Sequence, residues 1–346
     1  MEAPIGVRQL AAVRYSVRSV GRHAVRRVRT ELARSTTRHG RADVALFHEF
    51  EPAPAGGGHQ FLRALVRELE RRGLSVEHNR VSGGTQACLF NSFNFDFARL
   101  RRFARDDCRI VHRVDGPIGV YRGFDDGTDA RIAEVNAELA DATVLQSRYS
   151  LEKHVELGIE LRAPVVISNT VDPAIFHPPA TRKPFDGRPL RVIASSWSQN
   201  ERKGADVLAW LDDNVDPQRV AVTFVGQSRR RFSRIEHVSA LDSHGVARLL
   251  RTYDVYLAAS RDDPCSNALL EALACGLPAA YRDSGGHPEL VGAAGLPFRA
   301  PEELPDVLER LATDLDAFRA HIAVPSLSDV ADAYLGVFGW RAGTPP

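Results

Sequence analysis

The chain has 346 residues, of which 44% are apolar and 26% charged, and its formal net charge is +1. This size favours two or three domains, and this composition is ordinary for a globular protein. No apolar run reaches the roughly 18 residues of a membrane-spanning helix, and the first residues lack the apolar core of a secretory signal. The four cysteines form no C-x-x-C pair. We therefore expect a cytoplasmic protein with neither a structural zinc site nor a disulfide framework.

The charge is distributed unevenly, because residues 1–42 hold ten arginines against two glutamates. Within residues 8–34, apolar residues recur every three or four positions and arginines recur every four on another face, which predicts a basic amphipathic helix. Three interpretations stay open: contact with an anionic membrane surface, packing on the folded body, or a disordered basic arm. A nucleic-acid-binding arm is disfavoured, because no aromatic platform accompanies the charge.

From Asp43 onward, predicted strands alternate with predicted helices. The strands expected in the first half cover residues 44–50, 74–81, 87–93, 109–114, 143–146 and 165–168. The helices expected between them cover residues 60–72, 97–104, 128–139 and 148–157. This alternation is typical of a parallel sheet with helices on both faces.

A proline-rich stretch without periodicity separates this half from a second alternation. The later strands are expected at residues 190–195, 220–225, 236–240, 254–259 and 278–281. The later helices are expected at residues 204–213, 244–252, 301–315 and 328–338. The predicted organisation is thus a basic arm (1–42), a first domain (43–170), a linker (171–189), a second domain (190–325) and a last helix (326–346).

The most informative segment runs from residue 254 to residue 298. A short apolar strand is followed by Asp263-Pro264, which we expect to open a helix with Asp263 in the capping position. That helix is apolar on nearly all sides apart from Glu271, and a buried carboxylate is costly unless it is hydrogen-bonded. Ser284-Gly285-Gly286 and His287 then begin another helix, where a glycine turn can present backbone N–H groups to an anion.

These residues resemble the donor-binding signature of the family 4 retaining glycosyltransferases, which belong to glycosyltransferase group 1. The signature is an acidic residue, seven others and a glutamate, followed by Ala, Gly, Pro and a Gly-Gly-x-x-Glu loop. In this sequence its positions hold Asp263, Glu271, Ala272, Gly276, Pro278, Gly285, Gly286 and Glu289. The family usually has Glu where this chain has Asp263, whose side chain is shorter by one methylene.

The resemblance implies a GT-B fold, in which two Rossmann-like domains face each other across a cleft and the final helix crosses back to the first domain. It also implies that Asp263 contacts the donor sugar and that Glu271 binds the ribose hydroxyls. Two structural alternatives remain for these carboxylates: Asp263 as a plain helix cap, and Glu271 as a partner of a distant arginine.

Two further segments are similar to the family. Gly57 and Gly58 follow the first strand, where the family's glycines let the backbone approach the donor phosphate or the acceptor; the alternative is a flexible turn. Lys203 precedes a glycine in the second domain, where a lysine can neutralise a diphosphate leaving group. The arginine that the family places five residues earlier is Ser198 here, so Arg202 becomes the candidate second cation, against the alternative of a solvated surface charge.

Two more residues are weaker candidates for the site. Gly226 ends the second strand of the second domain, where the family binds the nucleotide, although a glycine there also suits a simple turn. His112 lies near the end of the strand that leads to Asp115, and family members often place a histidine there, facing the donor sugar. The alternative is a core histidine whose ring nitrogens are satisfied by neighbours.

The function implied by the resemblance is transfer of a sugar from a nucleotide-diphosphate sugar to a hydroxyl of a glycan, polysaccharide or lipid-linked acceptor, with retention. No Asp-x-Asp stands in a convincing strand-end context, so we expect no metal, and no cofactor besides the nucleotide-sugar donor substrate. We assign the catalytic roles to Asp263, Lys203 and His112. Two other classes stay open: a non-catalytic relative that binds sugar nucleotides, and a nucleotide-sugar epimerase.

Overall fold

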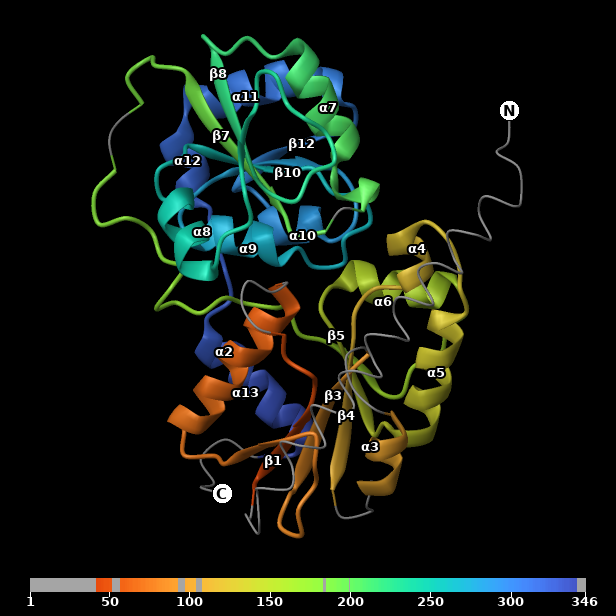
Figure 1. The fold of residues 1–346 in the computed structure, drawn as a ribbon. Helices are drawn as coiled ribbons and strands as arrows, with labels where there is room; N and C mark the ends of the chain where they lie inside the picture. Colours follow the sequence, from red (N-terminus) through yellow and green to blue (C-terminus); the bar gives the residue numbers. More distant parts are fainter. Residues whose placement is uncertain are drawn as a thin grey trace.

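The computed structural model describes residues 42–51, 57–92, 97–103, 108–182, 185–198 and 200–340. The basic helix predicted for residues 8–34 lies outside these described residues. The described residues form two α/β domains, one above the other in Figure 1. Within the described residues, each domain contains one six-stranded sheet, and all the strand pairs in both sheets are parallel. The α/β class with two Rossmann-like units, predicted from the alternation of patterns, is confirmed.

The first domain has the strand order β2-β1-β3-β4-β5-β6. Its strands are β1 (Val44–Phe47), β2 (Val76–His78), β3 (Ala87–Asn91), β4 (Arg109–Val114), β5 (Ala142–Leu145) and β6 (Pro164–Val166). Its helices are α2 (Gly57–Arg71), α3 (Phe97–Phe103), α4 (Ile118–Arg122), α5 (Thr128–Leu139) and α6 (Arg148–Glu156). The central strands β1 and β3 are buried along their whole length. Such strands read as continuous apolar runs because helices cover both of their faces.

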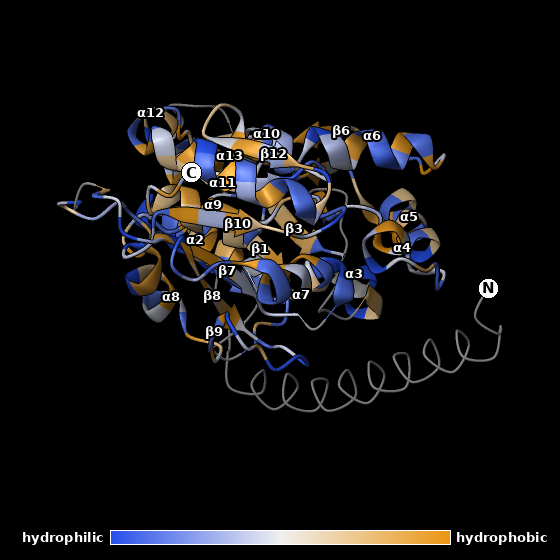
Figure 2. Cartoon of the chain, turned by 90° about the horizontal axis from the view of Figure 1, so that it is seen from above, coloured by the Kyte–Doolittle hydropathy of each residue, from blue (hydrophilic) through white to orange (hydrophobic). Residues whose placement is uncertain are grey.

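The second domain has the order β12-β11-β10-β7-β8-β9. Its strands are β7 (Leu190–Ser196), β8 (Val220–Gly226), β9 (Glu236–Val238), β10 (Val255–Ala258), β11 (Ala279–Arg282) and β12 (Gly295–Phe298). Its helices are α7 (Ala205–Asn214), α8 (Ser243–Leu250), α9 (Asn267–Ala274), α10 (His287–Val291), α11 (Leu304–Thr313) and α12 (Leu315–Ala320), with 3₁₀ turns η1 (Glu201–Lys203) and η2 (Pro301–Glu303). Seen from above, the helices that surround the strands contain both hydrophilic and hydrophobic residues (Figure 2).

The last helix, α13 (Leu327–Phe338), packs against α2 of the first domain (Figure 1). Its Val330, Ala331 and Tyr334 are almost fully buried and share one apolar cluster with Phe61 of α2. Burial of a side chain such as Val330 contributes about 1.5–3 kcal/mol. The chain therefore returns to the first domain after completing the second.

The structure differs from the sequence-based expectation in several local details; for example, the helix expected at residues 301–315 is divided into η2 and α11, and α12 follows it. Helix α9 begins at Asn267 and is capped by Ser266, whose hydroxyl accepts the N–H of Leu269, so Asp263 does not cap it. Strand β12 and helix α4 are present although no pattern predicted them. Both elements are only four or five residues long and contain glycine or proline, which leaves too little periodicity to recognise.

Candidate active site

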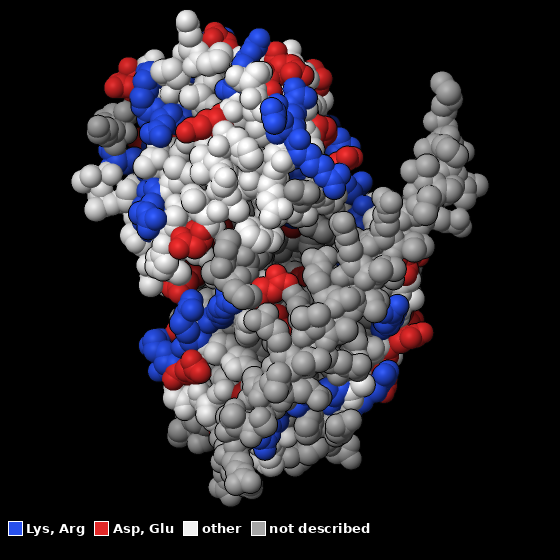
Figure 3. Space-filling model, viewed as in Figure 1, with Lys and Arg blue, Asp and Glu red and all other residues white. Residues whose placement is uncertain are grey.

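A cavity of about 420 Å³ lies between the two domains. It opens at the carboxyl ends of both sheets, because residues that directly follow β4, β7 and β10 line it. Open parallel sheets bind their ligands at this edge. Figure 3 shows a hollow between the domains, and the described surface of the second domain just above the hollow is largely uncharged. The first domain contributes Gly57, Gly58 and Arg113 to the wall, while the second contributes Lys203 and Asp263.

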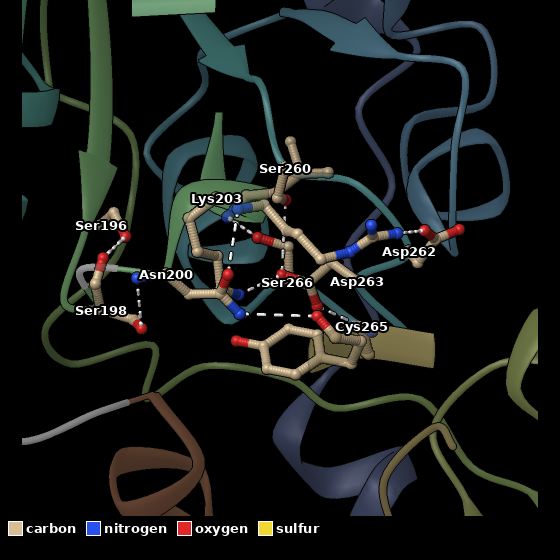
Figure 4. Close-up of polar contacts among 12 residues, drawn as sticks. Ser196, Ser198, Asn200, Lys203, Ser260, Asp262, Asp263, Cys265 and Ser266 are labelled. Carbon is tan, nitrogen blue, oxygen red and sulfur yellow. Dashed lines mark hydrogen bonds and ion pairs between the residues drawn. The ribbon is translucent and has the colours of Figure 1, made fainter. Parts of the chain in front are cut away.

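Lys203 and Asp263 form an ion pair in the wall of this cavity. The Nζ atom of Lys203 lies 2.6 Å from Oδ2 of Asp263, and the two side chains point toward one another in Figure 4. Burial alone would lower the pKa of Lys203, but the Asp263 carboxylate more than offsets this effect, so the pKa of Lys203 is raised. Burial likewise disfavours the charged form of Asp263, and the positive charge of Lys203 reverses this, so the pKa of Asp263 is lowered. Both side chains are therefore charged at neutral pH.

The backbone at Asp262 explains how Asp263 reaches the cavity. Asp262 adopts a left-handed conformation with φ of 52°, which is uncommon for a residue with a side chain. Ser284 stabilises this conformation, because its hydroxyl accepts the N–H of Asp262 at 3.0 Å. As a result the side chains of Asp262 and Asp263 point in opposite directions (Figure 4). Only the second of these carboxylates faces Lys203.

A second, smaller pocket of about 100 Å³ adjoins the main cavity and contains Glu271. No side chain of the described residues donates a hydrogen bond or pairs with Glu271, so the alternative of a structural arginine partner finds no support among them. Burial raises the pKa of this carboxyl to about 8. A carboxyl group in this position can accept hydrogen bonds from hydroxyl groups of a ligand, which would replace the water lost on burial.

Three of the predicted glycines line the pockets, and two of them lie where chain segments approach closely. Gly226 lines the smaller pocket with φ of 134°, and a Cβ atom there would stand 1.9 Å from the carbonyl oxygen of Ser196. Gly57 lines both pockets, and a Cβ atom there would meet the side chain of Asn267 at 2.3 Å. Gly58 lines the main cavity with open space around its Cα. The structure therefore brings all three glycines to the cavity walls.

Arg202 does not reach the main cavity. Its guanidinium forms an ion pair with Asp262, and Arg202 is not among the residues that line this cavity. Lys203 is thus the cation that the second domain contributes to the wall of this cavity, within the part of the chain that the structure describes.

The glycine turn of residues 284–287 lies behind the cavity wall rather than in it. The N–H of Gly286 donates to the carbonyl of Asp263 at 2.9 Å, and a Cβ atom on Gly285 would collide with the same backbone. The ring of His287 is fully buried, with its nitrogens 3.1 Å from the hydroxyl of Ser260 and from the carbonyl of Arg282. None of Ser284, Gly285, Gly286 and His287 lines either of the two pockets. These residues support the Asp263 segment from behind.

His112 is also absent from the cavity wall. Its ring is fully buried and stacks on Phe90, with 4.0 Å between the ring centroids. Its Nδ1 lies 3.0 Å from Nδ2 of Asn136, and its Nε2 lies 3.3 Å from the hydroxyl of Ser92. Burial lowers the pKa of His112 to about 3. The structure thus places His112 in the core of the first domain, with neighbours at both ring nitrogens.

Three residues of the wall were not singled out from the sequence. Arg113 is 1% exposed, and its guanidinium donates to the side-chain oxygens of Asn91 and Asn169 at 2.6 and 2.9 Å. The ring of Tyr121 lies 4.8 Å from Nζ of Lys203. Trp197 is 38% exposed and lines both pockets. The sequence offered one signal for Trp197: it directly follows the strand β7, and ligands of a parallel sheet bind at the carboxyl ends of its strands.

Two features are absent from the described residues. No group of three or more His, Cys, Asp or Glu side chains in the described part of the chain is arranged to hold a metal ion. Among the same residues, no helix has the length and apolar character needed to cross a bilayer.

One family model matches the chain, and the match lies within the second domain. Residues 189–314 match a family model described as "Glycosyl transferases group 1". No curated protein matches the sequence of the chain.

Solved structures share the fold of almost the whole chain at low sequence identity. Sucrose-phosphate synthase from Thermosynechococcus elongatus is 16% identical with a TM-score of 0.67, over 86% of this chain and 99% of that one. HepE from Anabaena, in complex with UDP and glucose, is 15% identical with a TM-score of 0.64, over 86% and 99%. The catalytic domain of starch synthase IV from Arabidopsis thaliana, bound to ADP and acarbose, is 12% identical with a TM-score of 0.65, over 87% and 99%.

These neighbours are glycosyltransferases of the GT-B fold, in which two parallel-sheet domains face each other as they do here. Residues 189–314 of this chain thus match the model of the group 1 glycosyl transferases, and the chain as a whole has the GT-B fold of these structures.

Proposed function

We propose that the protein is a glycosyltransferase that moves a sugar from a nucleotide-diphosphate sugar to a hydroxyl acceptor, with retention at the anomeric carbon and without a metal ion. The observation that carries this proposal is the Lys203–Asp263 pair in the wall of a cavity that both domains line. The family of the second domain and the fold of the chain agree with it. Retention follows from the resemblance of the carboxylate signature, in which Asp263 and Glu271 are the acidic residues.

Lys203 is suited to stabilise the leaving group. Breaking the bond between the anomeric carbon and the diphosphate leaves positive charge on the sugar ring and negative charge on the phosphate oxygens. The Lys203 ammonium has three N–H donors, of which Asp263 accepts one and the Tyr121 hydroxyl accepts another, so one remains for a phosphate oxygen. A fixed positive charge in a cavity from which water is excluded is among the strongest means of stabilising such a transition state.

Asp263 and Glu271 are suited to hold the two ends of the donor. Asp263 is 5% exposed and lies beside Lys203, so its carboxylate can accept a hydroxyl of the sugar next to the diphosphate. Glu271 occupies the adjoining pocket with Gly226, where the ribose hydroxyls can donate to it. The similar structures of HepE and starch synthase IV each contain a nucleoside diphosphate together with a sugar or sugar analogue, which supports a donor of this class.

The acceptor would enter from the side of the first domain, whose Gly57, Gly58 and Arg113 form the opposite wall. We place a glycan, a polysaccharide or a lipid-linked hydroxyl there. A cytoplasmic enzyme of polysaccharide biosynthesis would meet lipid-linked acceptors at the membrane surface. The arginines of residues 8–34 provide the positive charge for such peripheral contact.

The test is release of nucleoside diphosphate from a panel of UDP-, GDP-, ADP- and dTDP-sugars, with and without glycan and lipid acceptors. One donor is expected to turn over, and Lys203→Ala is expected to lower its rate by about 100-fold or more. Lys153→Ala is the matched control, because Lys153 pairs with Glu156 on an exposed helix and lies outside the cavity. Binding of a nucleotide sugar without turnover under any acceptor would instead indicate a non-catalytic relative, and interconversion of the free sugar nucleotide would indicate an epimerase.

A further inference from the structure

Helix α6 of the first domain is capped by a carboxylate of the second domain. The helix begins after Ser147, whose hydroxyl accepts the N–H of Ser150 at 3.0 Å. The N–H groups of Arg148 and Tyr149, which a helix leaves without partners in its own backbone, donate to the two carboxylate oxygens of Glu289 at 3.0 and 3.1 Å. A negative charge at this end of a helix is also favoured by the helix dipole. Glu289 therefore joins the two domains at a defined point.

Tyr149 of α6 makes a second contact across the domain boundary. The phenol hydroxyl of Tyr149 donates to Oδ1 of Asp262 at 3.0 Å. Asp262 is the residue in the left-handed conformation, and its other carboxylate oxygen pairs with Arg202. Tyr149 thus contacts the second domain through its backbone at Glu289 and through its side chain at Asp262.

These contacts are coupled to the Lys203–Asp263 pair through adjacent residues. Arg202 pairs with Asp262, and Lys203 pairs with Asp263, so two neighbouring ion pairs join the same two segments of the second domain. The first pair faces α6, while the second lines the cavity. The glycine turn that leads into α10, the helix that carries Glu289, is held at the same place, because the N–H of Gly286 donates to the carbonyl of Asp263 at 2.9 Å.

We propose that Glu289 and Tyr149 form an interdomain clamp that positions Lys203 and Asp263 against the first domain for the reaction. Neither clamp residue lines the main cavity, so both act through the segments that they hold. The clamp explains why this chain has a carboxylate three residues after its Gly-Gly pair, at the position where the loop meets α6. The catalytic consequence of this inference rests on the proposed function, whereas the clamp itself can be tested without turnover.

The test compares Tyr149→Phe, Glu289→Gln and the double variant with the wild type. Each substitution keeps the size of the side chain and removes one donor or one charge. Glu152→Gln is the control, because Glu152 is an exposed carboxylate on the same helix. The measurements are kcat and the donor KM, the Kd of the nucleoside diphosphate, hydrogen exchange of a peptide covering residues 147–157, and the radius of gyration with nucleoside diphosphate bound.

The clamp predicts that the double variant loses about tenfold or more in kcat, because small displacements of reacting groups are costly. The Kd of the nucleoside diphosphate should change by less than about twofold, because the clamp residues do not line the cavity. Exchange of the 147–157 peptide should accelerate, and the radius of gyration of the liganded protein should increase. The control should match the wild type in all four measurements.

Faster exchange with unchanged kcat would show that Glu289 is only a local helix cap, and it would overturn the proposal. If no donor is turned over by the wild type, the proposed function fails by itself, and scattering still decides on the clamp. In that case, an unchanged radius of gyration in the double variant would refute the clamp.

Discussion

Removing the Lys203 side chain tests how strongly the cavity depends on its ion pair. In Lys203→Ala, the Asp263 carboxylate loses a partner at 2.6 Å while its side chain stays only 7% exposed. Exposed pairs contribute at most about 1 kcal/mol, whereas breaking a buried pair costs about 3–5 kcal/mol. Asp263 keeps the N–H of Cys265 at 3.3 Å and the hydroxyl of Ser260 at 3.4 Å as weak compensation. We therefore expect a loss of about 3 kcal/mol in the free energy of unfolding at pH 8.

The loss should depend on pH in a direction that the structure fixes. In the wild type, Lys203 lowers the pKa of Asp263, so the stability from this pair is present above the pKa of the unfolded chain and disappears as pH falls through the lowered value. In Lys203→Ala the largest influence, burial, remains while the main opposing charge is gone, and only His287 and the N–H of Cys265 still favour the charged form, so the pKa of Asp263 should lie above the unfolded value. The folded variant then loses stability as pH rises from the pKa of Asp263 in the unfolded chain to its raised pKa in the folded variant. The loss is up to about 1.4 kcal/mol per pH unit in this range.

The assay is urea unfolding at pH 5 and pH 8, followed by fluorescence and by circular dichroism. The difference between variant and wild type should be larger at pH 8 than at pH 5. Lys153→Ala removes a lysine from an exposed pair and should cost less than about 1 kcal/mol at both pH values. A Lys203→Ala protein that is no less stable than Lys153→Ala at pH 8 would refute the reasoning about burial of the pair.

Three further predictions concern other residues of the site. Burial raises the pKa of Glu271 to about 8, so the folded protein should hold a proton that the unfolded chain releases, and stability should fall as pH rises from about 5 to 8; Glu271→Gln should remove this slope in urea unfolding, and an unchanged slope would contradict it. Burial lowers the pKa of His112 to about 3, so its ring should stay neutral, and its ring-proton NMR signals should not shift between pH 5 and pH 8. Ring-proton signals that titrate near pH 6.5 would contradict this prediction, because they would show a solvated ring. Trp197 lines both pockets, so Trp197→Ala should raise the donor KM about tenfold while Trp197→Phe changes it less, because an aromatic ring on a base or sugar contributes about 1–3 kcal/mol; equal KM values in all three proteins would exclude stacking.

Much of the fold could be predicted because helix and strand patterns are local. The strand at Arg109–Val114 and the helix at Thr128–Leu139 agree with expectation to the residue, and the two parallel sheets follow from the alternation. Strand β12 was missed because it is short and contains both a glycine and a proline. Its pairing with β11 supplies what its own sequence lacks.

The site was predictable where a motif fixed both residue type and spacing. Lys203 and Asp263 lie 60 positions apart in the sequence. The family resemblance predicts both as site residues, and in the structure their side chains form an ion pair. For other residues of the site, the sequence does not show in which direction the side chain points. His112 and Arg113 are neighbours on one strand, and they point to opposite faces because side chains alternate along a strand. Only the structure shows that Arg113 meets the cavity while His112 enters the core.

The glycine turn was misleading for a related reason. A sequence shows that backbone N–H groups are accessible to a close neighbour, but it does not show what that neighbour is. In this protein the backbone of Asp263 and Pro264 occupies the space beside Gly285 and Gly286. The N–H of Gly286 is accordingly used to hold the Asp263 segment.

The most direct test of the account is a crystal structure with the nucleoside diphosphate that binds most tightly. We expect the diphosphate in the 420 Å³ cavity, within hydrogen-bond distance of Nζ of Lys203, and the ribose beside Glu271. A nucleotide bound elsewhere, for example in the separate pocket beside Trp210 and Arg219 on the second domain, would contradict it.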